Sequence, residues 1–505
     1  MLFNSLQFFI FFPIVCLIIL FSTYVVKKNI INQIILLAAS LYFYMCWKPA
    51  YLLLILVSIF ITYMSGLYME NKSDKIKKII LSVALISNLG ILFFFKYAGF
   101  IVRTIDNLLH INQSNNFFDS ILLPVGISFY TFQALGYSID VYRGTIKAER
   151  NFITYALFVT FFPQLVAGPI ERSKNLLPQF KVNHEFDYNR VTDGLKLAAW
   201  GMFKKVVIAD KLALYVNTIY SDINAHGSIA IALATFFFTF QILCDFSGYT
   251  DIAIGTAQVL GFKLMSNFRQ PYFAKNIVDF WRRWHISLSS WFKDYVYIPL
   301  GGNRTGKLRH YFNILLTFLI SGLWHGAGWN FVFWGFLHGT AQVTAISTGE
   351  LRKNICSRLG VNEESSLHTI WQIFWTFIFV YITWIFFRVH SIYDGFKVLC
   401  KILYVPFEIV DIFKSIIGNG AAIFGTGFLQ NITLGMSKYD FCAPFFLIFV
   451  LLLNDVIGRK KSMLIRVKTM PLIVRWLGYY VLVLSILFAF LSNISTNSQF
   501  IYFQF

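Results

Sequence analysis

The segment that decides the fold reads NILLTFLISGLWHG, residues 313–326. It is an apolar run that ends on a histidine beside a tryptophan, and the stretch NIVDFWRRWH, residues 276–285, ends in the same way. An ionisable side chain at membrane depth is costly, so it tends to persist there only when it is paired, solvated in a cavity or functional. Histidine is also the side chain best suited to carrying protons near neutral pH. His325 and His285 are therefore the first candidates for chemistry.

The composition is that of a membrane protein. Of the 505 residues, 57% are hydrophobic, 19% aromatic and 13% charged, and the mean hydropathy is +0.63, which is far more apolar than ordinary globular usage. No soluble domain or internal repeat is evident, so we expect one all-α, polytopic membrane domain over residues 1–505. Residues 1–21 lack a basic start and a small-residue cleavage site, which indicates a first membrane helix rather than a signal peptide.

Apolar runs recur along the whole chain. Since a span needs about 20 apolar residues, they predict about 11 membrane helices, together with re-entrant or interfacial helices. The candidate runs are 6–26, 30–47, 50–69, 79–101, 121–141, 152–167, 195–215, 229–260, 311–323, 330–346, 371–387, 441–457 and 472–492. Residues 391–440 are glycine-rich and the least periodic part, and there we expect an external loop or surface helices.

The basic residues gather in the short connections between these runs. The formal net charge is +19, and this placement is typical of cytoplasmic loops that face anionic headgroups. Lys27 and Lys28 assign the first loop to the cytoplasm, and the basic residues of 459–468 do the same for the last one. We therefore expect a multi-pass protein of the cell membrane with both termini outside the cytoplasm and an odd number of crossings. No basic stripe interleaved with aromatic residues lies outside the apolar runs, so no nucleic-acid binding is expected.

Residues 279–300 form neither a clean span nor a plain loop. On a 3.6-residue period one side is apolar and the other is interrupted by charges, which favours an amphipathic helix at the interface or in a re-entrant position. The apolar side consists of Phe280, Trp284, Leu288, Trp291, Phe292 and Tyr295. His285 lies here beside Arg282 and Arg283. From the residues alone, a catalytic role and a place in a headgroup-level aromatic and basic belt are equally open.

His325 has the stronger case for function. As a helix, the roughly 15 residues from His310 to His325 climb about 22 Å, which places His325 in the outer half of the membrane. Gly322, Gly326 and Gly328 interrupt the helical pattern and allow close backbone approach, as expected around an intramembrane cavity. The alternative is a histidine that hydrogen-bonds between helices and has a structural role only.

Three further ionisable residues lie on apolar runs. His338 is more typical of a satisfied core histidine than of a catalytic one. Asp245 and Asp251 interrupt the run 229–260 and need partners at that depth, and pairing with Arg269 or Arg282 fits them better than catalysis. The six cysteines have no paired spacing, so the sequence predicts no metal site.

Five segments of the chain together form a recognisable set. They are PQLVAGPI (163–170), DFSGYTD (245–251), FWRRWHISL (280–288), GLWHG (322–326) and the ending FIYFQF (500–505). With them, and over nearly its whole length, the chain resembles the membrane-bound O-acyltransferase family. The resemblance is to the bacterial polysaccharide branch of that family, typified by the membrane subunit of alginate O-acetylation, with the D-alanyl transferase of teichoic acids as a more distant cousin.

The resemblance implies both a site and an activity. An essential histidine of the family falls on His325, and a second His or Asn of the family falls on His285. The implied enzyme moves an acyl group, expected to be acetyl from acetyl-CoA, from a cytosolic thioester across the bilayer for O-acetylation of an extracytoplasmic polysaccharide. A separate extracytoplasmic acetyltransferase often receives the group. In such a reaction a neutral His325 fits the general base and His285 fits an orienting or hydrogen-bonding group.

The residues leave three other functions open. A transporter or flippase of exopolysaccharide export would explain the many helices and the basic loops, but not a core centred on histidine. Transfer of D-alanyl groups to teichoic acid is the second, and a scaffold that recruits extracytoplasmic partners is the third. The sequence does not name the polysaccharide, and acetyl-CoA as donor follows from the resemblance only.

Overall fold

The computed structural model describes residues 1–110, 117–120, 122–166, 168–304, 306–419, 431–458 and 463–492. These residues form helices and no strand, so the all-α prediction is confirmed. The chain divides into two compact units: unit 1 is residues 1–201, 249–267 and 285–299, and unit 2 is residues 202–248, 268–284 and 300–505. Two features of the sequence lie outside the described residues: the ending 500–505, which is one of the segments that carry the family resemblance, and Gly420, Gly425 and Gly427 of the glycine-rich part 391–440.

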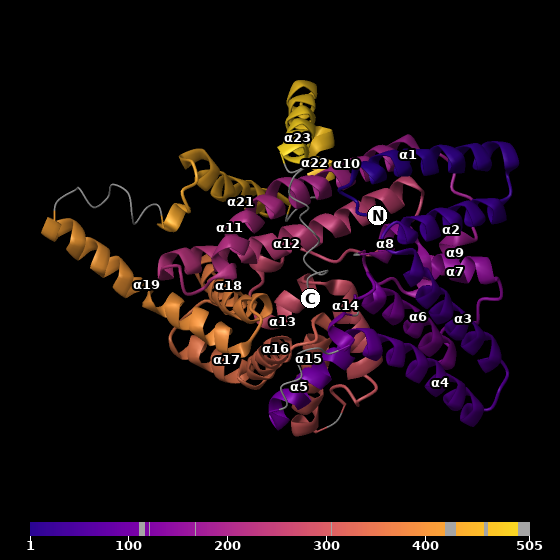
Figure 1. The fold of residues 1–505 in the computed structure, drawn as a ribbon, viewed down its shortest axis with the longest axis horizontal. Coiled ribbons are helices and arrows are strands. Elements are labelled where there is room, and N and C mark those ends of the chain that lie inside the picture. The colour runs from indigo at the N-terminus through magenta and orange to yellow at the C-terminus, as the bar shows by residue number, and fades with distance from the viewer. Residues whose placement is uncertain are drawn as a thin grey trace. The chain divides into compact units, whose positions relative to one another are not determined.

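Unit 1 carries the N-terminal helices (Figure 1). Its central element is α6, whose residues are almost all buried and which packs against α3 and α4. Gly66 of α3 makes this approach possible, because a methyl group there would lie 2.6 Å from the hydroxyl of Tyr137 on α6. The helices are α1 (Leu6–Phe21), α2 (Asn29–Met45), α3 (Leu52–Met69), α4 (Asp74–Leu92), α5 (Ala98–Leu109), α6 (Ile127–Tyr142), α7 (Phe152–Thr160), α8 (Phe162–Leu165), α9 (Ser173–Phe180), α10 (Tyr188–Met202) and α14 (Ile286–Phe292).

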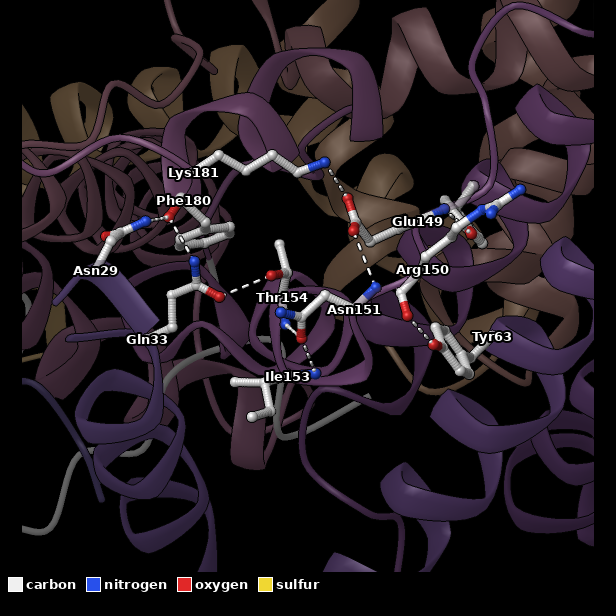
Figure 2. A network of polar contacts seen from close by, with 11 residues as sticks. Asn29, Gln33, Tyr63, Glu149, Arg150, Asn151, Ile153, Thr154, Phe180 and Lys181 are labelled. Atoms are coloured by element: carbon white, nitrogen blue, oxygen red, sulfur yellow. Dashed lines mark hydrogen bonds and ion pairs between the residues drawn. The ribbon is translucent and has the colours of Figure 1, made fainter. Parts of the chain in front are cut away.

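Polar contacts join the helices of unit 1 at several points (Figure 2). Gln33 of α2 accepts a hydrogen bond from the Thr154 hydroxyl of α7 at 2.7 Å, and it donates to the carbonyl of Phe180 at 2.9 Å. Glu149 forms an ion pair with Lys181 at 2.6 Å. Buried polar groups in an apolar surrounding are costly unless they are hydrogen-bonded, so these contacts fix which helices can neighbour each other.

Unit 2 is built around the helical hairpin of α15 and α16. Glycines set the spacing of the two helices, because a Cβ on Gly322 would lie 3.2 Å from the Cα of Gly335, and the reverse also holds. Small residues at such positions let two backbones approach closely in a membrane protein. The helices are α11 (Asp210–Ser221), α12 (Ser228–Val259, which continues into unit 1), α13 (Ile277–Arg283), α15 (Lys307–His325), α16 (Trp329–Ser347), α17 (Gly349–Arg358), α18 (Ser366–Arg388), α19 (Ile392–Asn419), α21 (Lys438–Gly458), α22 (Met463–Thr469) and α23 (Leu472–Ser492).

Short π- and 3-10 segments extend or connect these helices. In unit 1 they are η1 (Ser22–Val26), η2 (Pro49–Tyr51), η3 (Phe93–Tyr97), η4 (Phe117–Ser120) and η7 (Lys293–Tyr297), and in unit 2 they are η5 (Phe203–Ala209) and η6 (Pro271–Phe273). The π-helix η5 matters for the site, because it carries two buried lysines.

Within the described residues, seven helical segments are long and apolar enough to cross a membrane. They are Leu6–Val26, Pro49–Met69, Asp74–Leu109, Ser228–Val259, Ser366–Arg388, Lys438–Gly458 and Leu472–Ser492. This confirms a multi-pass membrane protein. The other predicted runs correspond to shorter or more polar helices such as α2, α6 and α15, and the expected total of about 11 crossings stays a prediction.

The structure decides between two local alternatives and corrects one further expectation. Of the external loop or surface helices expected at 391–440, the described residues are mostly helix, because residues 392–419 form the 28-residue helix α19. Residues 279–300 are not one amphipathic helix, since α13 ends at Arg283 and α14 begins at Ile286. Trp284 and His285, at the break, are fully buried.

Candidate active site

His325 is the last residue of α15 in unit 2 and is 2% exposed. Gly326 and Gly328, which follow it, are extended, and Gly328 caps α16, so the chain turns back within three residues. A Cβ on Gly326 would overlap the ring of Phe331. The predicted break after His325 is therefore confirmed, and the close approach is required by the tight link between the two helices.

Aromatic rings surround the imidazole of His325. Its centroid lies 5.0 Å from that of Trp324, 5.1 Å from that of Trp334 on α16 and 5.5 Å from that of Phe387 on α18, all with edge-to-face geometry. Asn330 fixes the start of α16 to the end of α18 by donating to the carbonyls of Val389 at 2.8 Å and Phe386 at 3.3 Å. Ring packing therefore holds this histidine inside the apolar part of unit 2.

His285 lies in unit 1 and is fully buried, and the feature that sets its position is its backbone. Its φ of +43° and ψ of 53° are left-handed, a conformation in which histidine is enriched but which still costs roughly 1–2 kcal/mol. Asn267 stabilises the turn, because its carbonyl accepts from Ile286 N at 3.0 Å and its side chain accepts from Ser287 N at 3.1 Å. Phe129 of α6 stacks on the imidazole, with centroids 6.4 Å apart.

His338, on α16, is also fully buried. Its Nδ1 accepts a hydrogen bond from Trp281 Nε1 at 3.2 Å, and its ring lies 4.7 Å from Trp334, centroid to centroid. Trp334 therefore contacts both His325 and His338. No local pattern indicated the Trp281–His338 bond or the role of Asn267, because both depend on residues far apart in the chain.

Asp245 has a different partner from the one expected. Lys205, on η5, forms ion pairs with Asp245 at 2.7 Å and with Asp210 at 2.9 Å, and all three side chains are buried. The neighbouring Lys204 donates to Ser247 at 2.8 Å. Asp245 therefore pairs with a cation as expected, but the cation of this ion pair is Lys205, where Arg269 or Arg282 was expected. The described residues contain no group of three or more His, Cys, Asp or Glu side chains that could hold a metal ion.

Comparison with known proteins identifies relatives across most of the chain. The profile of MBOAT, the membrane-bound O-acyltransferase family, matches residues 147–388, a range that contains both His285 and His325. The chain is 36% identical over 427 residues to a peptidoglycan O-acetyltransferase of Helicobacter pylori, covering 79% of each sequence. It is 37% identical over 399 residues to a probable alginate O-acetylase of Pseudomonas putida, covering 78% of each. A teichoic acid D-alanyltransferase of Streptococcus thermophilus is 29% identical over 260 residues, which is 49% of this chain and 62% of that protein.

Proposed function

The chain belongs to the membrane-bound O-acyltransferase family, and we propose that it transfers an acetyl group from acetyl-CoA for O-acetylation of a polysaccharide outside the cell membrane. The observation that carries this proposal is the buried His325 at the end of α15, inside a protein that is similar over most of its length to two kinds of glycan O-acetylating protein. The acceptor is a cell-surface glycan such as peptidoglycan or an alginate-like polysaccharide, reached directly or through an extracytoplasmic acetyltransferase.

In this proposal His325 is the general base. The acceptor hydroxyl gives its proton to the neutral imidazole while its oxygen attacks the carbonyl carbon of the thioester. The carbonyl electrons move onto oxygen and then return, the carbon–sulfur bond breaks, and the thiolate of CoA takes up the proton from the imidazolium. His285 orients a reactant or donates a hydrogen bond to it, as the family resemblance implies. A base positioned in this way contributes roughly 10²–10⁴-fold to the rate.

The test is donor-dependent release of CoA by the purified protein in proteoliposomes, with the acceptor glycan present. We expect His325→Ala to lower the rate by about 10²–10⁴-fold when rates are compared at equal amounts of folded protein. His310→Ala, at the other end of the same helix, is the matched control and should keep the rate of the unsubstituted protein. A wild-type protein that moves glycan without releasing CoA would support a flippase, and turnover only with a D-alanyl thioester would support the teichoic-acid reaction.

We also propose the orientation that the basic loops predict, with both termini outside the cytoplasm. Lys72, in the exposed link between α3 and α4, is then cytoplasmic. A Lys72→Cys protein lacking the native cysteines should react with a membrane-impermeant maleimide only after the cells are permeabilised. Labelling of intact cells would reverse the assignment.

A further inference from the structure

The starting observation is a second buried histidine next to His325. Trp334 and His338 lie four residues apart on α16, so their side chains are on the same face of the helix. Aromatic side chains pack against both residues. Phe280 stacks on His338 with ring centroids 6.2 Å apart, and Trp384 stacks on Trp334 with ring centroids 5.9 Å apart. The two residues therefore lie in a water-poor surrounding.

The hydrogen bond from Trp281 decides where His338 carries its proton. An indole N–H can only donate, so the Nδ1 that it reaches must be an acceptor, and the neutral ring carries its hydrogen on Nε2. Neither Nε2 of His338 nor Nε1 of Trp334 has a hydrogen-bond partner among the described residues. Leaving a buried N–H without an acceptor costs about 1–3 kcal/mol. Two such donors on one helix face are therefore a feature that needs a reason.

The position of Trp334 and His338 near His325 in unit 2 indicates what these two N–H donors could bind. The ring of Trp334 contacts both the ring of His325 and that of His338, with centroid distances of 5.1 and 4.7 Å. A ligand held by these N–H groups would lie beside the proposed base. It must offer a lone pair and needs no proton of its own, which fits a carbonyl oxygen better than a sugar hydroxyl.

We propose that the Nε2–H of His338 and the Nε1–H of Trp334 bind the carbonyl oxygen of the acyl group during transfer. This inference rests on the proposed function. Both hydrogens stay on nitrogen throughout, and the only changes at this oxygen are the gain of the carbonyl electrons on attack and their return when sulfur leaves. Donors aimed at such an oxygen act mainly in the transition state, where the negative charge is largest.

The test compares substitutions that remove an N–H with substitutions that keep one. His338→Phe and Trp334→Phe retain a buried ring but lose the donor, and each should lower kcat by about 10²–10³-fold with little change in the KM for acetyl-CoA. His338→Gln can accept from Trp281 and still donate, so it should recover part of the lost kcat. His368→Phe and Trp371→Phe, near the start of α18, where His368 is half-buried and Trp371 exposed, are matched controls and should keep the wild-type kcat.

A second measurement covers the possibility that a variant is poorly folded. The probe is acetonyl-CoA, a ketone analogue of acetyl-CoA with a ¹³C-labelled carbonyl, bound to the protein and observed by infrared difference spectroscopy. Hydrogen bonding should move the carbonyl band to lower wavenumber in the wild type, and the band should move back in Trp334→Phe, which keeps the packing.

The outcomes separate the two proposals. An active wild type with unchanged kcat in His338→Phe and Trp334→Phe, or with the same carbonyl band in all three proteins, overturns the inference and leaves the proposed function intact. Equal losses in His338→Phe and His338→Gln together with a lowered Tm assign a structural role to His338 and overturn it as well. A wild type that releases no CoA from acetyl-CoA rejects the proposed function instead.

Discussion

His285 in unit 1 and His325 in unit 2 are both buried in a membrane protein, yet different forces position them. At His285 the backbone takes a left-handed conformation, and the main-chain and side-chain oxygens of Asn267 hold the turn. At His325 the chain is an ordinary helix end, and the rings of Trp324, Trp334 and Phe387 enclose the imidazole. One histidine is fixed through hydrogen bonds to the main chain and the other through side-chain packing.

This difference determines which substitutions each position can tolerate. A residue that replaces His285 must first accept positive φ, which asparagine and glycine do readily and bulky side chains do not. A residue that replaces His325 meets no such backbone demand, but it must fill the space between the rings without leaving a cavity. The same substitution therefore tests mainly the chemistry of the imidazole at His325, whereas at His285 it also tests the left-handed backbone conformation.

Among tests of the difference between His285 and His325, the largest effect on transfer rate and Tm is expected for substitutions of His285. His285→Phe should lower both the transfer rate and the Tm, because it loses the imidazole and suits the left-handed backbone poorly. His285→Gly suits the left-handed backbone but leaves the space of a buried ring empty, so it should lower the Tm through lost packing only and lose about as much activity. His285→Asn should keep the backbone and one hydrogen-bonding group, and hence partial activity. The measurement is CoA release at matched expression, together with thermal unfolding in detergent.

Equal activity in the Asn, Gly and Phe variants would remove His285 from the catalytic proposal. A Gly variant as active as the wild type would show that only the backbone turn matters. His325 would then be the sole histidine of the pair with a proposed role.

A smaller effect is expected at two buried asparagines that anchor the two regions. Asn267→Ala removes the acceptor for Ser287 N, and Asn330→Ala removes the donor to Phe386 and Val389. Each should lower the free energy of unfolding by about 1–3 kcal/mol, since a buried polar group loses its partner. Only Asn267→Ala should also lower the turnover of the folded protein, by roughly tenfold to 100-fold, because a slightly misplaced reacting group is costly.

Unfolding and turnover measured on the same samples test this pair. Asn267→Ala with normal turnover would mean that the position of His285 does not depend on the side chain of Asn267. A loss of turnover in Asn330→Ala as large as in Asn267→Ala would remove the distinction between the two regions.

The helices that the sequence predicted well are those whose signal is local. The first candidate run, 6–26, coincides with a membrane-type helical segment of the structure, and so does the last, 472–492. His325 ends its helix where the glycines predicted. An apolar run with glycine after it needs no information from distant parts of the chain.

The features that the sequence did not predict depend on tertiary contacts. The apolar period of residues 280–295 continues through His285, so nothing local marks the break that Asn267 stabilises. The pairing of Asp245 with Lys205 depends on η5, where a wider helical turn brings two successive lysines to contacts with α12. The joint action of His285 and His325 also stays a proposal that rests on the family resemblance, because the two histidines belong to different units of the chain.

The buried Lys205–Asp245 pair has a consequence for how the protein is made. A lone carboxylate near the middle of a membrane helix costs about 3 kcal/mol at the insertion step. Asp245 lies well inside the 32-residue helix α12. Lys205 precedes it in the chain, so the ribosome completes the cation before the anion that it neutralises. Synthesis from the N-terminus thus supplies the partner in advance, and a circularly permuted chain that begins between them would have to insert the carboxylate first.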